Sequence, residues 1–241
     1  ALVFAYDAEW VTAIQPQGEG LSALWAAFRT YEALRELGLN VDIVPPGHDL
    51  TGYAIAVLPC LPIVSDDCAA NLAAFEGPIV IGPRSGSKTA EFAISGELPP
   101  GPLQHIFPGK VSRSESLRPG VEHSGDGWTI RRWLDHLDTD AEPELRAEDG
   151  TVACYRHDNV RYCAGWPEGA LIAEIVRHAV GDAKLPCHTC SQGLRLRTTE
   201  HYVFAFNYGG APQELPESLM GECIIGDRML APAGVAVLRR S

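Results

Sequence analysis

Long apolar runs and an excess of positive charge are both missing from this sequence of 241 residues. No stretch reaches the 18 or so apolar residues that a membrane-spanning helix needs, so we expect no membrane partner. Lysine and arginine total 19 against 31 aspartate and glutamate residues, which gives a formal net charge of −12. This balance argues against nucleic acid or an anionic membrane surface as the main partner.

A signal peptide and a regular cysteine framework are missing as well. The opening residues, ALVFAYD, contain no basic segment and include an early aspartate. The seven cysteines show no framework spacing, which fits a reducing compartment, and we expect a cytoplasmic protein. The sequence starts at Ala1, without methionine, directly in a strand-like pattern. We therefore expect a fragment, or a chain whose upstream part is missing.

Apolar runs and amphipathic segments alternate through the first third of the chain. Short apolar runs predict buried strands, and segments with helical spacing or a capping residue predict helices. Predicted strands cover residues 1–7, 41–45, 53–59 and 78–82, and predicted helices cover residues 20–37 and 66–76. This order predicts an α/β fold, a flavodoxin-like or class I amidotransferase-like parallel sheet with helices on both faces.

The two predicted helices carry specific signals. Apolar side chains at positions 21, 24, 25, 28, 31, 34 and 37 predict one broad apolar face for the helix over 20–37. Gly38 is expected to end that helix, because glycine readily adopts the left-handed conformation found after a last turn. Ser65 is expected to cap the start of the helix over 66–76.

The remainder of the chain changes character twice. Residues 96–127 are rich in proline and glycine and predict an irregular excursion on the rim of the sheet. Residues 151–166 predict two strands around the turn HDN, and residues 170–183 predict an amphipathic helix. After residue 185 the apolar period becomes two, which is typical of an antiparallel sheet. We therefore expect two domains, residues 1–185 and a small β domain at 186–241.

The segment GPRSGSKT (82–89) follows an apolar strand and resembles a phosphate-binding loop. A true phosphate-binding loop requires four residues between its glycines and a lysine directly after the second glycine. Here Gly86 comes one residue early, Ser87 separates it from Lys88, and Pro83 removes a backbone N–H donor. We therefore predict no nucleotide cofactor, and interpret this segment as a loop at the carboxyl edge of the sheet, where α/β folds bind ligands.

Cysteine chemistry finds weak support. Cys60 ends the third predicted strand, where cysteine hydrolases place a nucleophile, but its context LPCLP lacks the small residues of a strained nucleophile turn. We interpret it as an inert core residue. The motif CHTC has a Cys187–Cys190 pair, yet Cys154 and Cys163 are nine residues apart and make a poor second pair for zinc. No metal site is predicted.

Two segments at the predicted sheet edge have no purely structural role, DAEWVTAIQPQGEG (7–20) and GPRSGSKT (82–89). An exposed tryptophan beside amides and basic side chains is typical of a sugar-contacting or protein-contacting surface. The candidates for a substrate wall or an interface are Glu9, Trp10, Arg84, Ser87 and Lys88. The acidic residues lie on predicted helix faces and loops, so no carboxylate pair for glycosidase chemistry is predicted, and no catalytic residue.

The same segments carry a resemblance to a known family. The chain is similar to family 42 glycoside hydrolases, the β-galactosidases, in the part that follows their catalytic barrel. The matching motifs, in the family's order, are FAYDAEWVTAIQPQGEG, VDIVPPGHDLTGY, VLPCLPIVSD, IGPRSGSKT, LPPGPLQ, ESLRPG, AGWPEGAL, FAFNYG and PAGVAVL. Departures include Ala5, where the family often has aspartate, Cys60, where it has a small apolar residue, and CHTC, which has no counterpart.

The resemblance implies a flavodoxin-like trimerisation domain followed by a small C-terminal β domain, without the barrel that holds both catalytic glutamates. It implies a homotrimer that is inactive alone. The implied parent cleaves terminal non-reducing β-D-galactosides with retention, and substrate meets only the missing barrel. Two alternatives remain open: a free-standing amidotransferase-like cysteine hydrolase using Cys60, and a carbohydrate-binding module that works without a barrel.

Overall fold

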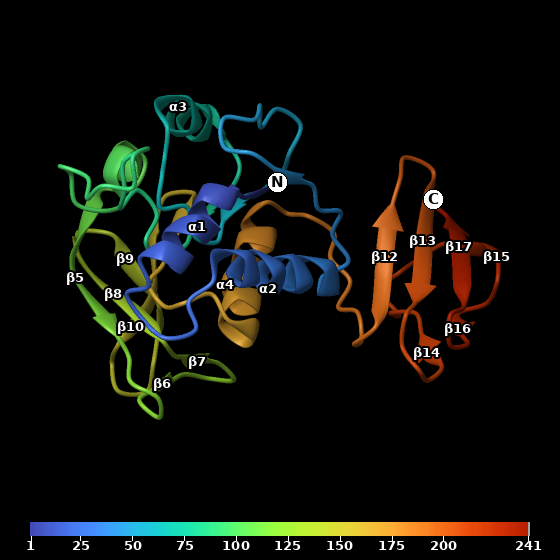
Figure 1. Cartoon of the computed structure of the whole chain (residues 1–241). Helices are drawn as coiled ribbons and strands as arrows, with labels where there is room; N and C mark the ends of the chain where they lie inside the picture. Colours follow the sequence, from blue (N-terminus) through green and yellow to red (C-terminus); the bar gives the residue numbers. More distant parts are fainter. Residues whose placement is uncertain (241) are drawn as a thin grey trace. The chain divides into compact units, whose positions relative to one another are not determined.

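The computed structural model describes residues 1–240, and contacts divide them into two units. The first unit holds residues 1–30 and 42–185, and the second holds residues 31–41 and those from Pro186 onward. Helix α2 (Ala23–Glu36) therefore contributes its first turns to one unit and its last turns to the other. Figure 1 shows the helices gathered around the sheet of the first unit and a β structure in the second.

A seven-stranded sheet forms the centre of the first unit, in the order β2-β1-β3-β4-β11-β10-β9. The four strands β2, β1, β3 and β4 are parallel, as predicted, and β11 continues them in parallel. The prediction of a wholly parallel sheet was wrong, because β10 pairs antiparallel with both β11 and β9 and the sheet is mixed. The hairpin between β10 and β11 turns at Asp158, with φ 51°, and this reverses the direction of β10. The strands are β1 (Leu2–Val3), β2 (Ile43–Val44), β3 (Ala56–Leu58), β4 (Ile79–Ile81), β9 (Glu142–Arg146), β10 (Val152–His157) and β11 (Val160–Cys163).

Two helices follow their sequence signals closely. Helix α3 (Asp66–Ala74) begins where Ser65 accepts a hydrogen bond from the backbone N–H of Cys68, which confirms the predicted cap. Helix α4 (Gly169–Asp182) packs against β4 and β11 with a fully buried apolar face. Arg161 on β11 donates hydrogen bonds of 2.8 Å to both oxygens of Glu144 and one of 2.7 Å to Asp182. This buried network connects α4 to the sheet.

The N-terminal prediction was wrong in one element. The predicted strand over residues 1–7 is only β1, and most of the predicted edge segment 7–20 forms helix α1 (Tyr6–Ile14). The buried side of α1 consists of Ala8, Val11 and Thr12, spaced as one helical face. These side chains are small, so they give a weak periodic signal.

Helix α2 was correctly predicted, and Gly38 follows it with φ 75°. Its predicted apolar face was wrong over the first turns. Leu24, Trp25 and Phe28 are exposed, while alanines and Thr30 are buried on the opposite side. Small side chains allow a helix backbone to pack closely, so the first unit accepts alanines here and leaves the large apolar side chains outside.

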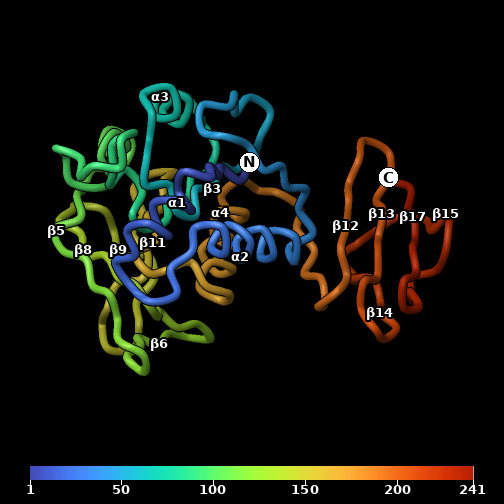
Figure 2. The backbone as a smooth tube through the Cα atoms, viewed as in Figure 1, coloured from blue at the N-terminus to red at the C-terminus, as the bar shows by residue number. Residues whose placement is uncertain are grey.

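Residues 96–127 contain more structure than predicted. A 3₁₀ turn, η1 (Gly101–His105), leads into β5 (Gly109–Ser116), which pairs antiparallel with β8 (Trp133–Thr139). A short hairpin joins β6 (His123–Ser124) and β7 (Thr129–Ile130). The tube in Figure 2 follows this green segment beside the central strands. Pairing with β8, whose partner residues lie 17 to 30 positions further along the chain, stabilises β5 in a way that local composition does not reveal.

The second unit is a small antiparallel sheet, as predicted. Its order is β12-β13-β17-β15, made of β12 (Leu194–Thr198), β13 (Tyr202–Asn207), β17 (Val235–Arg239) and β15 (Glu222–Ile225). A two-stranded ladder, β14 (Gln213–Glu214) with β16 (Met229–Leu230), accompanies it. Leu194, Leu196, Ala205 and Leu238 are fully buried in its core. Within this unit, Arg35 from α2 donates a hydrogen bond to the carbonyl of Leu196.

Candidate functional site at the edge of the sheet

The loop after β4 is fixed tightly against its surroundings. Arg84 has φ 65°, a left-handed conformation that is uncommon for residues other than glycine. Gly82 and Gly86 flank it, and a Cβ on either would overlap the backbone of Pro59 or Pro100. The resulting G-x-R-x-G turn has the spacing of a nucleophile elbow, with arginine at the position where a hydrolase has its nucleophile. A nucleophile elbow leads into a helix, whereas an isolated bridge and turns follow Gly86 here, so the loop shares only the glycine spacing with such an elbow.

Arg84 is only 3% exposed, and all three of its guanidinium nitrogens lack a hydrogen-bond partner among residues 1–240. The guanidinium carbon lies 5.5 Å from the centroid of the Trp133 ring. Burial lowers the pKa of Arg84, while the nearby Cys60 and Asp135 oppose that shift. The side chain is thus stabilised by the face of an aromatic ring and by nearby negative charge.

Asp135 on β8 organises a buried network that the sequence did not reveal. Its Oδ1 accepts hydrogen bonds from Ser114 Oγ at 2.6 Å and Trp133 Nε1 at 2.8 Å. Its Oδ2 accepts from Tyr162 Oη at 2.9 Å and from the backbone N–H of Arg84 at 3.4 Å. Burial raises the pKa of Asp135, and the hydrogen bonds oppose that shift. Both oxygens are occupied, so this carboxylate holds strands and loop together.

The remaining loop candidates make mainly backbone contacts. Ser87 Oγ donates a hydrogen bond of 2.6 Å to the carbonyl of Arg84 and closes the turn. The backbone of Lys88 pairs with Ile63 on one side and Ile94 on the other. Both side chains are partly exposed. Of the three candidates in this loop, Ser87 and Lys88 are partly exposed and Arg84 is buried.

The two candidates on α1 have different environments. Glu9 Oε2 accepts hydrogen bonds from the backbone N–H of Leu24 at 2.8 Å and from Ser22 Oγ at 3.0 Å. It therefore caps the start of α2, where the free N–H groups and the helix dipole favour a carboxylate. Trp10, one residue further, is 53% exposed. The structure thus separates a capping residue from an exposed aromatic side chain.

Cys60 has the environment of an inert thiol. It is 2% exposed and belongs to a core cluster with Ala8, Trp133 and Trp166. Burial raises the pKa of its thiol to about 12. A nucleophilic cysteine needs a depressed pKa, so this environment argues against thiol catalysis at neutral pH.

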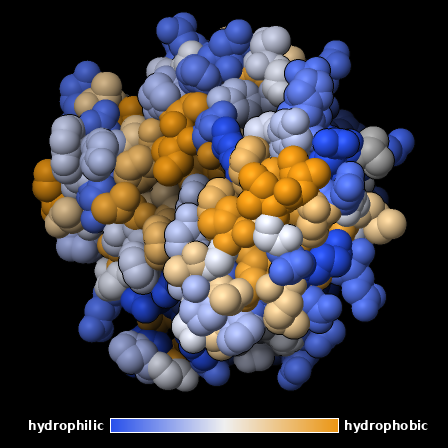
Figure 3. All heavy atoms as spheres, turned by 90° about the vertical axis from the view of Figure 1, so that its right-hand side faces the viewer, coloured by the Kyte–Doolittle hydropathy of each residue, from blue (hydrophilic) through white to orange (hydrophobic). Residues whose placement is uncertain are grey.

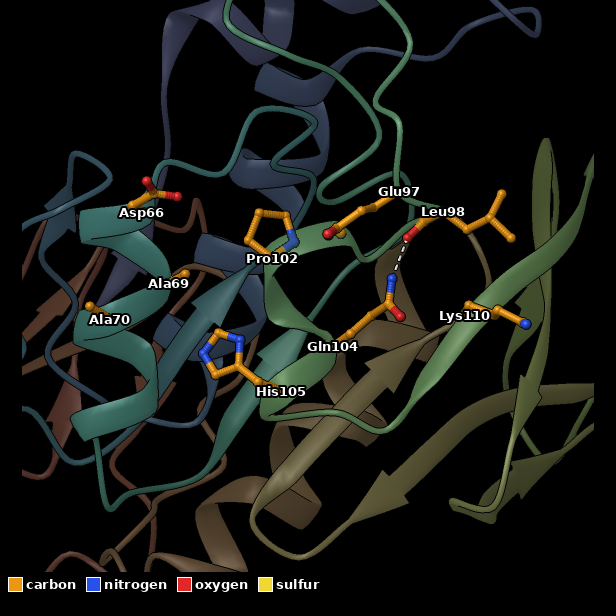
Figure 4. A pocket seen from close by; sticks show the side chains of 10 residues that line it. Asp66, Ala69, Ala70, Glu97, Leu98, Pro102, Gln104, His105 and Lys110 are labelled. Atoms are coloured by element: carbon orange, nitrogen blue, oxygen red, sulfur yellow. Dashed lines mark hydrogen bonds between the residues drawn. The ribbon is translucent and has the colours of Figure 1, made fainter.

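A groove of the first unit lies between α3 and the segment that contains η1 (Figure 4). Its volume is about 770 Å³, within the range of ligand-binding clefts. Gln104 Nε2 donates a hydrogen bond of 2.7 Å to the carbonyl of Leu98 and stiffens one wall. The lining mixes acidic, basic and small apolar side chains: Asp66, Ala69, Ala70, Glu97, Leu98, Gly101, Pro102, Gln104, His105 and Lys110.

The cysteine motif of the second unit does not form a cluster of metal ligands. Cys187 is exposed, whereas Cys190 is buried and its thiol donates to the carbonyl of His188. Among the described residues no three His, Cys, Asp or Glu side chains converge as metal ligands would. Within the same residues, every helix is too short or too polar to cross a bilayer.

Comparison with known proteins matches this description. The chain matches the family model for a β-galactosidase trimerisation domain over residues 1–186 and that for a β-galactosidase C-terminal domain over residues 193–240. It is 43% identical to a β-galactosidase of Thermus thermophilus, covering 98% of this chain, and 35% identical to one of Halorubrum lacusprofundi, covering 90%. A crystal structure of a β-galactosidase from the psychrophilic Marinomonas ef1 superposes with a TM-score of 0.92, at 30% identity over the whole chain.

The mixed α/β unit and the small antiparallel unit correspond, in the order of the chain, to the two matched domains. The chain belongs to the family 42 β-galactosidases and consists of their trimerisation and C-terminal domains. It spans 37% of the length of the Thermus thermophilus relative and of the Marinomonas structure. The resemblance in the sequence motifs is thereby confirmed.

Proposed function

We propose that this chain is the assembly region of a β-galactosidase and that it forms a homotrimer. The observation that carries the proposal is the trimerisation-domain match over residues 1–186, three quarters of the chain. A closed ring of three copies is a common way for a soluble protein to build an oligomer. Within the ring, the small β domain, proposed as residues 186–241, accompanies the trimerisation domain, proposed as residues 1–185.

The chain alone is proposed to be inactive. Its parent would hydrolyse terminal non-reducing β-D-galactosides with retention, using carboxylates outside this region. Retaining hydrolysis needs two carboxyl groups about 5 Å apart and open to the sugar. At the sheet edge, Asp135 is buried and Glu9 is engaged as a helix cap. Both carboxylates have structural roles, which supports the proposal that this chain does not catalyse hydrolysis.

The finer features are proposed in the same sense. The order of the parallel strands, with β1 between β2 and β3, supports a flavodoxin-like arrangement of the first unit. Seven free cysteines support a cytoplasmic location. Trp10 and Lys88 are proposed to contact a neighbouring surface, whereas Glu9, Arg84 and Ser87 shape the elements that present them.

Two measurements on the purified chain test the proposal. Multi-angle light scattering across a dilution series should give a mass near 78 kDa, three times the 26.0 kDa of one chain. Incubation with nitrophenyl β-D-galactoside should release no nitrophenol above the buffer rate. A mass of one chain at every concentration contradicts the assembly role. Hydrolysis that a glutamate substitution within this chain abolishes contradicts the non-catalytic role.

A further inference from the structure

Six large apolar side chains of the first unit point outward from two adjacent helices. They are Tyr6, Trp10 and Ile14 on α1 and Leu24, Trp25 and Phe28 on α2, and we call them the aromatic helix face. Their exposed fractions lie between 43% and 68%. The two helices are neighbours, since Glu9 and Thr12 of α1 accept hydrogen bonds from the first N–H groups of α2. Large apolar side chains that a soluble protein exposes together on neighbouring elements often mark a contact site.

The regular spacing along each helix places these side chains on the side that faces away from the core. On α1 the three residues are spaced four apart, so they lie along one side of the helix. The opposite side, with Ala8 and Val11, is buried. Helix α2 likewise buries its alanines and presents its largest apolar side chains outward. The fold therefore does not use these side chains for its own core.

The two helices also hold the face in a defined arrangement. Glu9 of α1 accepts a hydrogen bond from the N–H of Leu24, which fixes the start of α2 against α1. The Trp25 and Phe28 rings stack at 5.2 Å with planes 24° apart, and the Arg29 guanidinium lies 4.7 Å from the Trp25 centroid. Tryptophan, tyrosine, phenylalanine and arginine are the residues enriched in protein interfaces. A pre-ordered face of this composition loses little side-chain entropy on binding.

The area available is sufficient for a stable contact. With 150–250 Å² for each large side chain, the six together expose roughly 600 Å². A standard interface buries about 800 Å² on each partner. Polar residues around the six side chains would supply the remaining area as the rim of the interface. The face can therefore form the apolar centre of a specific interface.

We propose that the aromatic helix face is the surface through which one copy of this chain binds a second copy, an inference that rests on the assembly role proposed above. The residues of the face lie within 1–186, the range that matches the trimerisation domain. A competing apolar patch lies in the second unit, on Ile224 and Ile225 of β15 with Met229 and Val235. Figure 3 shows the face on the right-hand side of Figure 1, where apolar side chains gather. The patch on β15 lies outside residues 1–186, the range of the trimerisation-domain match. We therefore assign the contact to the aromatic helix face.

The test compares substitutions on the face with matched ones elsewhere. The face variants are the double variant W10S/I14S and the single variant W25S. The controls are I94S in the first unit and I225S in the second, whose wild-type side chains are 82% and 59% exposed. Sedimentation equilibrium over a dilution series gives the concentration at which the trimer dissociates, and circular dichroism checks that each variant keeps its helices. We expect that concentration to rise at least tenfold for both face variants and to stay at the wild-type value for both controls.

The outcomes separate this inference from the assembly role. A wild-type trimer that both face variants also form overturns the assigned surface and leaves the assembly role intact. Loss of the trimer in I225S alone overturns it in favour of the β15 patch. The wild-type chain could instead stay a monomer and form a one-to-one complex with the separately produced remainder of a parent β-galactosidase. If W10S/I14S prevents that complex, the face binds the remainder, and both the assigned surface and the assembly role are overturned.

Discussion

At the scale of single residues, Asp135 shows how a buried carboxylate in this trimerisation domain can serve structure alone. Each of its oxygens accepts one hydrogen bond from an N–H group, Trp133 Nε1 on one side and the Arg84 backbone on the other. An N–H group cannot reverse its role as a hydroxyl can. An asparagine at this position would therefore direct its NH₂ group at one of these two N–H donors in either orientation of its side-chain amide.

We predict that D135N lowers the free energy of unfolding by about 2–4 kcal/mol, since it leaves buried polar groups unpaired. The control S114A removes a single donor from Oδ1 and should cost about 1 kcal/mol. Urea unfolding followed by tryptophan fluorescence measures both. Equal losses for the two variants would contradict the donor geometry described here.

At the scale of elements, side chains of α1 stabilise the start of α2, because Glu9 and Thr12 both accept hydrogen bonds from its first N–H groups. Glu9 lies in the first turn of α1 and places its carboxylate at the free N–H groups of α2. A cap supplied from another helix couples the stability of the two elements. Loss of the cap should affect both the start of α2 and the position of α1.

We predict that E9A lowers the free energy of unfolding by about 1–2 kcal/mol, the usual cost of losing a cap together with its charge at a helix start. E9Q keeps an acceptor and should lose less than half of that. Glu19 is exposed in the loop between the two helices, so E19A serves as the control and should leave stability within about 0.5 kcal/mol of wild type. A loss in E19A that matches E9A would exclude the capping role.

The elements that could be predicted from sequence are those with local signals. The residues of β3 and β4 are continuously apolar, which predicts buried strands. The side chain of Ser65 caps α3, and a serine at this position predicts the start of a helix. Helix α1 was missed because its buried side has only small residues, and the outward face of α2 was missed because its largest side chains are outside. The Asp135 network joins residues 84, 114, 133 and 162, so only the folded chain brings it together.

At the scale of the whole molecule, charge opposes the proposed assembly. Each chain carries a formal net charge of −12, so a trimer carries three times −12, or −36. Like charges repel over a distance set by the ionic strength, about 30 Å at 0.01 M and about 8 Å at 0.15 M. The apolar contact must overcome this repulsion, which is greatest in dilute buffer.

We therefore predict that raising sodium chloride from about 0.01 M to about 0.15 M lowers the concentration at which the trimer dissociates by roughly tenfold, because screening removes long-range repulsion while apolar contact persists. Sedimentation equilibrium at neutral pH provides the measurement, and sucrose at equal osmolality is the uncharged control. If salt instead promotes dissociation, ion pairs across the interface outweigh the net repulsion. The contact would then be centred on charged side chains and not on the aromatic helix face.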